Sequence, residues 1–178
     1  MTLLLNDGKG NLQPQPAIAT VSGAIAIATG ELDGRPGTDV AVVGTSGNLQ
    51  ILANDGAGNL TGLPLIPTGA APADVAIAEM DGLNRRDVVV RREGAIQVFL
   101  NDGSGALVPL TAVAAAGTSG LVVASLDERP RADALIASPT LSLVQLFSNN
   151  GSGSMIEDRS ITVTGGPTQF GVGNFDGG

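Results

Sequence analysis

Acidic residues recur in this chain at a spacing that suits a loop for a hard cation. In each of three copies an oxygen-bearing side chain occupies the first and third positions of a short loop, and an Asp follows at the ninth. Ca²⁺ prefers about six to eight oxygen ligands, which short Asp-rich loops with a turn glycine supply. The spacing Asp-x-Asp-x-Asp-Gly-x-x-Asp is only partly present. The candidate ligands are Glu31, Asp33 and Asp39; Glu79, Asp81 and Asp87; Ser125, Asp127 and Asp133; and Asn174 and Asp176, which begin a fourth copy.

Side chains that support most catalysis are missing from the composition. The chain has no Cys and no His, so it lacks a thiolate nucleophile and the commonest general base. The glycine-rich segments "GAGNL" and "GSGAL" have neither the Lys nor the following helix of a phosphate-binding loop. We therefore expect a protein that is not an enzyme.

The charge distribution excludes further classes. The formal net charge is -8, and the nine basic residues are scattered, whereas a nucleic-acid groove needs a basic stripe. No apolar run approaches the roughly 20 residues that span a bilayer. Residues 1–5 are too short and too uncharged for a signal peptide, so we expect no export signal within this chain.

An internal repeat in the sequence indicates which structural elements would position the acidic loops. Two unlike motifs recur in step, with copies about 48 residues apart, and a register this constant indicates a structural repeat. The first motif, an Asn-Asp-Gly turn such as "LNDGKGNL", occupies 5–12, 53–60, 100–107 and 148–155, and the second, the acidic loop motif, occupies 28–34, 76–82, 122–128 and 171–178.

Each repeat unit is predicted to contain four antiparallel strands. The first alternates bulky and small apolar residues and ends at the acidic loop, which indicates a strand buried on both faces. The second is rich in Val and Ala, and a Gln interrupts the third at one fixed place. The expected second strands are 39–43, 87–91 and 133–137; the third strands 49–53, 96–100 and 144–148; and the fourth strands 60–68, 107–115 and 155–164.

Repeated four-stranded units of this length are typical of a β-propeller. The sequence predicts an all-β fold in one segment, 1–178, with fifteen strands and about four blades, as an open arc or an incomplete ring. A β-sandwich of unrelated hairpins is disfavoured, because it needs no constant register. The predicted units are 1–23 (partial), 24–69, 70–117, 118–166 and 167–178 (partial).

Over essentially its whole length the chain resembles the FG-GAP and VCBS repeats, the integrin-α-like propellers. The resemblance depends on the "NDGxGNL" turns, on "GAAP" at 69–72 and "GGP" at 165–167, and on the "DG" loops with a downstream Asp. It implies an extracellular or cell-surface module. It also implies loops that bind Ca²⁺ through positions one, three, five and nine and a backbone carbonyl at seven.

The chain departs from that family pattern at loop positions five and six. A ligand and a turn glycine are lost in each of the first three copies. In two of them an Arg replaces the ligand, and a guanidinium near two carboxylates can neutralise them as a metal would. We therefore expect mostly metal-free loops stapled by Arg–Asp pairs, with no cofactor or with Ca²⁺ at low occupancy. The replacements are Arg35, Leu83 and Arg129 at position five and Pro36, Asn84 and Pro130 at position six.

Three functions follow as expectations. The first is a non-catalytic extracellular module for protein recognition, adhesion or scaffolding; a glycan ligand is disfavoured because four Phe are the only aromatic residues. The second is a structural arc whose exposed edge strands pair with further blades or with a second copy. The third is a propeller domain appended to a secreted enzyme. The Asn-Asp-Gly motif itself is expected to be a hairpin turn and not a metal site.

Overall fold

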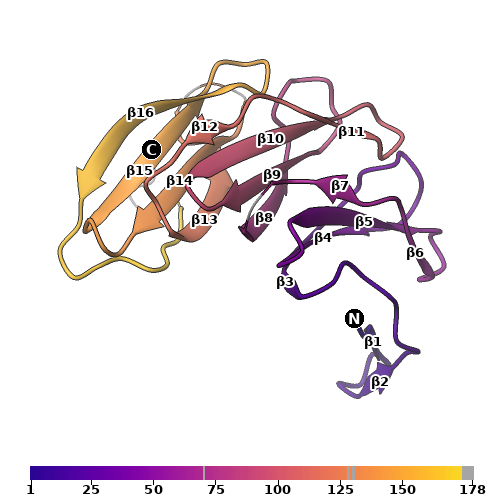
Figure 1. The fold of residues 1–178 in the computed structure, drawn as a ribbon. Coiled ribbons are helices and arrows are strands. Elements are labelled where there is room, and N and C mark those ends of the chain that lie inside the picture. Colours follow the sequence, from indigo (N-terminus) through magenta and orange to yellow (C-terminus); the bar gives the residue numbers. More distant parts are fainter. Residues whose placement is uncertain (70, 128, 130, 174–178) are drawn as a thin grey trace.

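The computed structural model describes residues 1–69, 71–127, 129 and 131–173. The strands of this described part build three antiparallel sheets and a separate two-stranded hairpin, and no helix occurs among them. Figure 1 shows the sheets following one another along an arc, with the hairpin at its N-terminal end. This is the architecture of propeller-like blades, and none of the sheets closes into a barrel.

Each sheet lies within one predicted repeat unit, and we call the three sheets blade 1, blade 2 and blade 3. The hairpin consists of β1 (Leu4–Asn6) and β2 (Leu12–Pro14). Blade 1 consists of β3 (Ala24–Gly30), β4 (Asp39–Gly44), β5 (Asn48–Asn54), β6 (Leu60–Gly62) and β7 (Ile66–Pro67). Blade 2 consists of β8 (Pro72–Ala78), β9 (Asp87–Arg92), β10 (Ala95–Asn101), β11 (Leu107–Pro109) and β12 (Val113–Ala114). Blade 3 consists of β13 (Ser119–Ala124), β14 (Asp133–Ser138), β15 (Leu143–Asn149) and β16 (Met155–Thr162).

The fourth strand differs from the prediction in blades 1 and 2, where it is split into two short strands that both pair with the third strand. The recurrent Gln explains the break. Gln50 Nε2 donates to the carbonyl of Leu63 at 3.1 Å, and Gln97 Nε2 donates to Leu110 at 2.8 Å. In blade 3 the fourth strand is continuous, and Gln145 Nε2 donates instead to Glu157 at 2.7 Å.

The core lies between the blades. At the junction of blades 1 and 2, Val43 and Ile51 pack in one cluster with Val88 and Phe99, and a similar cluster joins blades 2 and 3. The middle strands therefore bury both faces, as their continuous Val and Ala runs predict. Each fully buried Val, Leu or Phe contributes about 1.5–3 kcal/mol, so these junctions hold the arc together.

The first strands are less buried than predicted. Ile27 of β3 is 58% exposed, whereas Val75, at the same place in blade 2, is 9% exposed and packs against blade 1. The reason is that no inner strand of another blade covers this face of β3 within the described chain. The predicted fifteenth strand is absent over 167–173, where the described residues form no strand. Its remaining residues, 174–178, lie outside the described part.

Turns between the third and fourth strands take the predicted hairpin form. They carry glycines with positive φ, which an L side chain adopts at a cost of roughly 1–2 kcal/mol. At Gly56 (φ +81°) an added Cβ would also lie 2.6 Å from the carbonyl oxygen of Pro36, whereas at Gly151 (φ +93°) it would meet open space.

These equivalent glycines give a matched pair of substitutions. Gly56→Ala is expected to lower the free energy of unfolding by about 2–4 kcal/mol, and Gly151→Ala by only about 1–2 kcal/mol. Urea unfolding followed by circular dichroism measures both. Equal losses would contradict the contact between the turn of blade 1 and Pro36.

Candidate functional site

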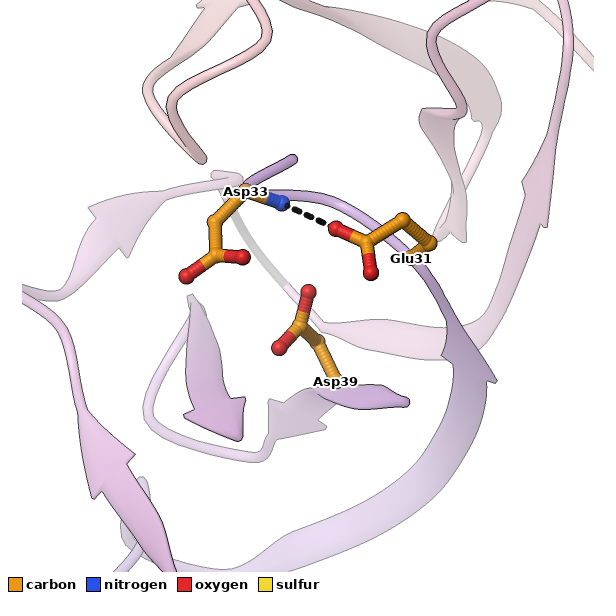
Figure 2. A group of neighbouring side chains, drawn as sticks. All are labelled: Glu31, Asp33 and Asp39. Atoms are coloured by element: carbon orange, nitrogen blue, oxygen red, sulfur yellow. Dashed lines mark hydrogen bonds between the residues drawn. The ribbon is translucent and has the colours of Figure 1, made fainter. Parts of the chain in front are cut away.

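The acidic loops bring their predicted ligands together in the first two blades. One oxygen each from Glu31, Asp33 and Asp39 lies within 4.8 Å of the others, and a second triad, Glu79, Asp81 and Asp87, does the same. Figure 2 shows the three side chains of the first triad, with the Asp33 amide donating to Glu31. Each loop follows the first strand of its blade and ends where the second strand begins.

The ninth-position Asp is the buried anchor of each loop. Asp39, Asp87 and Asp133 are buried, and each carboxylate bridges two backbone amides. One oxygen accepts from the second loop residue and the other accepts from the Asn that ends the third strand. The amide donors to Oδ2 are Leu32 at 2.7 Å, Met80 at 2.8 Å and Leu126 at 3.2 Å, and those to Oδ1 are Asn54 at 2.8 Å, Asn101 at 2.8 Å and Asn149 at 2.9 Å.

The remaining acids close the loops on themselves. Glu31 Oε1 accepts from the amides of Asp33 (3.0 Å) and Gly34 (2.7 Å), and Asp33 Oδ1 accepts from the amide of Arg35 (2.9 Å). The second loop repeats these contacts, with Glu79 accepting from Gly82 and Asp81 from Leu83. The loop amides thus find acceptors within the loop, as in a self-contained turn.

The third loop does not form a comparable triad. Ser125 Oγ donates to the carbonyls of Arg129 (2.9 Å) and Asp127 (3.3 Å), and Asp127 is exposed. In the first two loops the three carboxylates supply only part of a Ca²⁺ shell of about six to eight oxygens, since the fifth-position ligand is missing. The present residues therefore do not fit a complete calcium loop. The fourth-copy candidates, Asn174 and Asp176, lie outside the described residues.

The predicted Arg–Asp pairs form, but they are weak. Arg35 Nε lies 4.0 Å from Asp33, and Arg129 Nε lies 3.6 Å from Asp127, with guanidinium-bearing side chains 77% and 67% exposed. Such surface pairs contribute about 0–1 kcal/mol. At position seven, the guanidinium of Arg131 lies so near Gly82, in the preceding blade, that an added Cβ would collide with it.

Sequence reasoning missed the Asn that starts each turn motif. Asn101 Nδ2 donates across the blade junction to the carbonyl of Leu32 at 2.6 Å, and Asn149 Nδ2 donates to that of Met80 at 2.8 Å. Both partners lie 69 residues upstream. These amides, which we call the Asn clasps, join the turn of one blade to the acidic loop of the blade before it. The signal for them was the same Asn at the same place in each copy.

Opposite environments shift the pKa values of two aspartates in blade 2. Burial raises the pKa of Asp87 above its ordinary value of 3.8, although the amides of Asn101 and Met80 oppose the rise. The hydroxyl and the amide of Ser104 lower the pKa of Asp102, which lies in the exposed turn. The first carboxylate is structural, and the second stabilises a turn.

The two shifts predict opposite contributions to stability as pH changes. Between pH 3.8 and the raised pKa of Asp87, the folded chain binds more protons at this group than the unfolded chain, so its contribution falls as pH rises. The contribution of Asp102 is present above pH 3.8 and is lost as pH falls through its lowered pKa. Carboxyl-carbon NMR titration is expected to place Asp87 above and Asp102 below 3.8; the reverse order would contradict this environment.

Comparisons with known proteins support the fold alone. No protein-family model matches the chain, and no curated protein matches it. A crystal structure of a protein from Lactobacillus plantarum matches with a TM-score of 0.67 and 17% identity, over 92% of this chain and 49% of that one. The chain therefore spans about half the length of that protein.

A second solved structure is less similar. It is the Tc holotoxin pore of Photorhabdus luminescens, with a TM-score of 0.49 and 16% identity over 87% of this chain and 8% of that one, and it carries no argument about fold. In the described part of this chain no helix has the length and hydropathy needed to cross a membrane.

Proposed function

We propose that the chain is a non-catalytic module of the FG-GAP/VCBS type that recognises a protein partner at the cell surface or outside the cell. One observation supports the proposal: in blades 1, 2 and 3 the anchor Asp of the acidic loop accepts hydrogen bonds from backbone amides. These carboxylates therefore stabilise the loops and are not free to act as catalytic groups. The loops are then a fixed surface for binding.

The acidic loops and the Asn-Asp-Gly turns share one edge of the blades, which we call the rim. They meet there because each anchor Asp bonds the Asn at the start of the turn. The rim exposes carboxylates such as Asp55 and Asp102 and also cations such as Lys9 and Arg129. Loops of mixed charge held by a rigid scaffold are suited to specific recognition of a protein.

A capture experiment with matched charge reversals tests this function. The immobilised chain is exposed to surface proteins of the cells that produce it, and bound proteins are identified by mass spectrometry. Asp55→Lys with Asp102→Lys is expected to lose a discrete partner that wild type and Glu93→Lys, an exposed change at the opposite end of blade 2, both retain. No discrete partner, or equal capture by all three chains, would contradict rim recognition.

Calcium binding is expected to be absent or weak, because the loops lack the fifth-position ligand and their acids already accept amides. Titration calorimetry with Ca²⁺ is expected to show no micromolar site. Addition of a chelator is expected to leave the melting temperature unchanged. Micromolar binding of one ion or more per chain would show that the loops are functional calcium sites.

The exposed face of β3 favours assembly as a second candidate function. Ile25 and Ile27 lie uncovered on a face that, in blades 2 and 3, packs against the preceding blade through Val75 and Leu121. We propose that a further blade of the same type covers it. Light scattering is expected to show concentration-dependent association that Ile27→Lys abolishes; a monomer at all concentrations would leave recognition by the rim as the function.

A further inference from the structure

Blade 2 contains a pair of charges that the other blades lack. Asp74 on β8 and Arg91 on β9 are directly opposite each other in the antiparallel register. Small or apolar residues occupy both places elsewhere, so the fold does not require charge there. The equivalents of Asp74 are Ala26 and Gly120, and those of Arg91 are Val43 and Ala137.

Arg91 is largely withdrawn from solvent, whereas the Asp74 side chain is 34% exposed. The Arg91 side chain is only 7% exposed, and its Nη2 and Nε donate to Asp74 Oδ2 at 3.1 and 3.4 Å. Its Nη1 donates to the carbonyl of Thr118 at 2.9 Å. The other carboxylate oxygen of Asp74, Oδ1, accepts no hydrogen bond from the described residues. One acceptor and the remaining guanidinium protons are thus left for a ligand.

Stability accounts for only part of this pair, namely the Arg91–Thr118 bond that joins blade 2 to blade 3. Removing the Arg91 guanidinium from water costs several kcal/mol, and replacing a buried charged side chain with its partner by apolar residues of similar volume is often neutral or stabilising. In blades 1 and 3 the position equivalent to Arg91 is occupied by an apolar residue, Val43 or Ala137. A role beyond folding is therefore the better explanation for the charges.

A cavity of about 380 Å³ opens onto Asp74 and Arg91. This volume lies within the range of about 300–1,000 Å³ that small-ligand sites occupy. Ser119, Thr168, Gln169 and Phe170 line its other walls. Phe170 is half-buried there, whereas Phe99 and Phe147 are fully buried in the core, so part of the Phe170 side chain is accessible to a ligand.

The chemistry of the cavity selects a class of ligand. The two charges cancel, so neither an anion nor a cation gains from entering. Donors on Arg91, acceptors on Asp74 and Thr168, and the apolar ring of Phe170 suit a molecule with many hydroxyl groups and an apolar face. Four Phe are few for glycan binding, but one of them, Phe170, lines this cavity. We propose that the cavity binds a small neutral carbohydrate, with hydroxyl groups on Asp74 and Arg91 and its C–H face on Phe170.

This carbohydrate site is separate from the rim. β8 runs towards the acidic loop and Asp74 lies near its start, and β9 leaves that loop and Arg91 lies near its end. The cavity therefore opens at the end of the blades opposite the rim. Its occupation does not depend on the proposed recognition function, and either can fail alone.

NMR with the ¹⁵N-labelled chain tests the proposal. The probes are glucose, galactose, N-acetylglucosamine and mannitol, each titrated into the millimolar range. At least one is expected to give saturable shifts at the amides of Ser119, Gly120 and Gln169, while rim amides such as Ala57 stay in place. No saturable shift with any probe would overturn the proposal, as would binding of glycine or acetate at these amides in place of the sugars.

Two variants separate binding from folding. Asp74→Ala combined with Arg91→Val gives blade 2 the residues of blade 1, so the fold is expected to survive, with rim amides unmoved and sugar binding lost. Phe170→Leu leaves the ion pair intact and is expected to weaken binding about tenfold. Saturable shifts of wild-type strength in either variant would show that the cavity does not bind the sugar.

Discussion

Replacement of Asp87 by Ala is expected to lower the free energy of unfolding by about 2–4 kcal/mol. The carboxylate is fully buried and accepts the amides of Met80 and Asn101, both at 2.8 Å. Its loss leaves two buried donors without acceptors, and each costs about 1–3 kcal/mol. The removal of a desolvated charge, whose raised pKa records its burial, offsets part of this loss.

The conservative variant sharpens the test. Asp87→Asn keeps one acceptor oxygen but turns an amide group towards the other backbone donor, so about half of the loss is expected. Urea unfolding measures both variants by circular dichroism, since the chain has no Trp or Tyr. Asp102→Ala, in an exposed turn of the same blade, is the control and is expected to unfold close to wild type. A loss below about 1 kcal/mol for Asp87→Ala would show that the anchor is dispensable.

Replacement of Asn101 by Ala is expected to have a similarly large effect, about 2–4 kcal/mol. The side chain is buried and donates to Leu32 across the junction at 2.6 Å and to Arg86 within its own blade at 2.9 Å. Its oxygen accepts the turn amides of Gly103 and Gly105. The variant leaves all four of these backbone groups without this partner, and four net hydrogen bonds at about 0.5–1.5 kcal/mol each support the estimate.

Asn54 is the matched control for the cross-junction bond. It holds its own turn through Gly56 and Gly58 and donates to Thr38, but it makes no bond to another blade within the described chain. Asn54→Ala is therefore expected to cost about 1–2 kcal/mol less than Asn101→Ala. In Asn101→Ala hydrogen exchange is expected to quicken in the loops of both blade 1 and blade 2, whereas in Asn54→Ala, which loses the bond to Thr38, it is expected to quicken in the loop of blade 1 alone. Equal losses and unchanged exchange would contradict the clasp.

The blade topology is predictable from the sequence because two regular patterns, one within strands and one between turns, are visible without knowing which residues are in contact. Alternation within strands and a constant interval between turns require no knowledge of distant contacts. The splitting of the fourth strand was not predictable in this way, since it depends on the Gln50 and Gln97 amides reaching backbone carbonyls. The exposure of Ile27 also escaped prediction, because a repeat shows which face packs but not whether a neighbour covers it.

The candidate site was predictable to a similar extent. The spacing of Glu31, Asp33 and Asp39 correctly predicts that their carboxylates converge. The role of Asn101 was not predictable, because its partner, Leu32, belongs to another blade and no local pattern links the two. Charge matching correctly paired Arg35 with Asp33. The pair is weak because it is exposed to solvent, and the sequence gives no measure of that exposure.

The Asn clasps run in one direction along the chain, which has a consequence for synthesis on the ribosome. Chains emerge N-terminus first, at about 5–20 residues per second. Asn101 is synthesised 69 residues after Leu32, so their hydrogen bond cannot form until then. For several seconds the acidic loop of blade 1 has been translated but lacks its hydrogen bond to blade 2, which forms only when the turn of blade 2 has folded. Each blade thus completes the one made before it, so maturation trails translation by one blade.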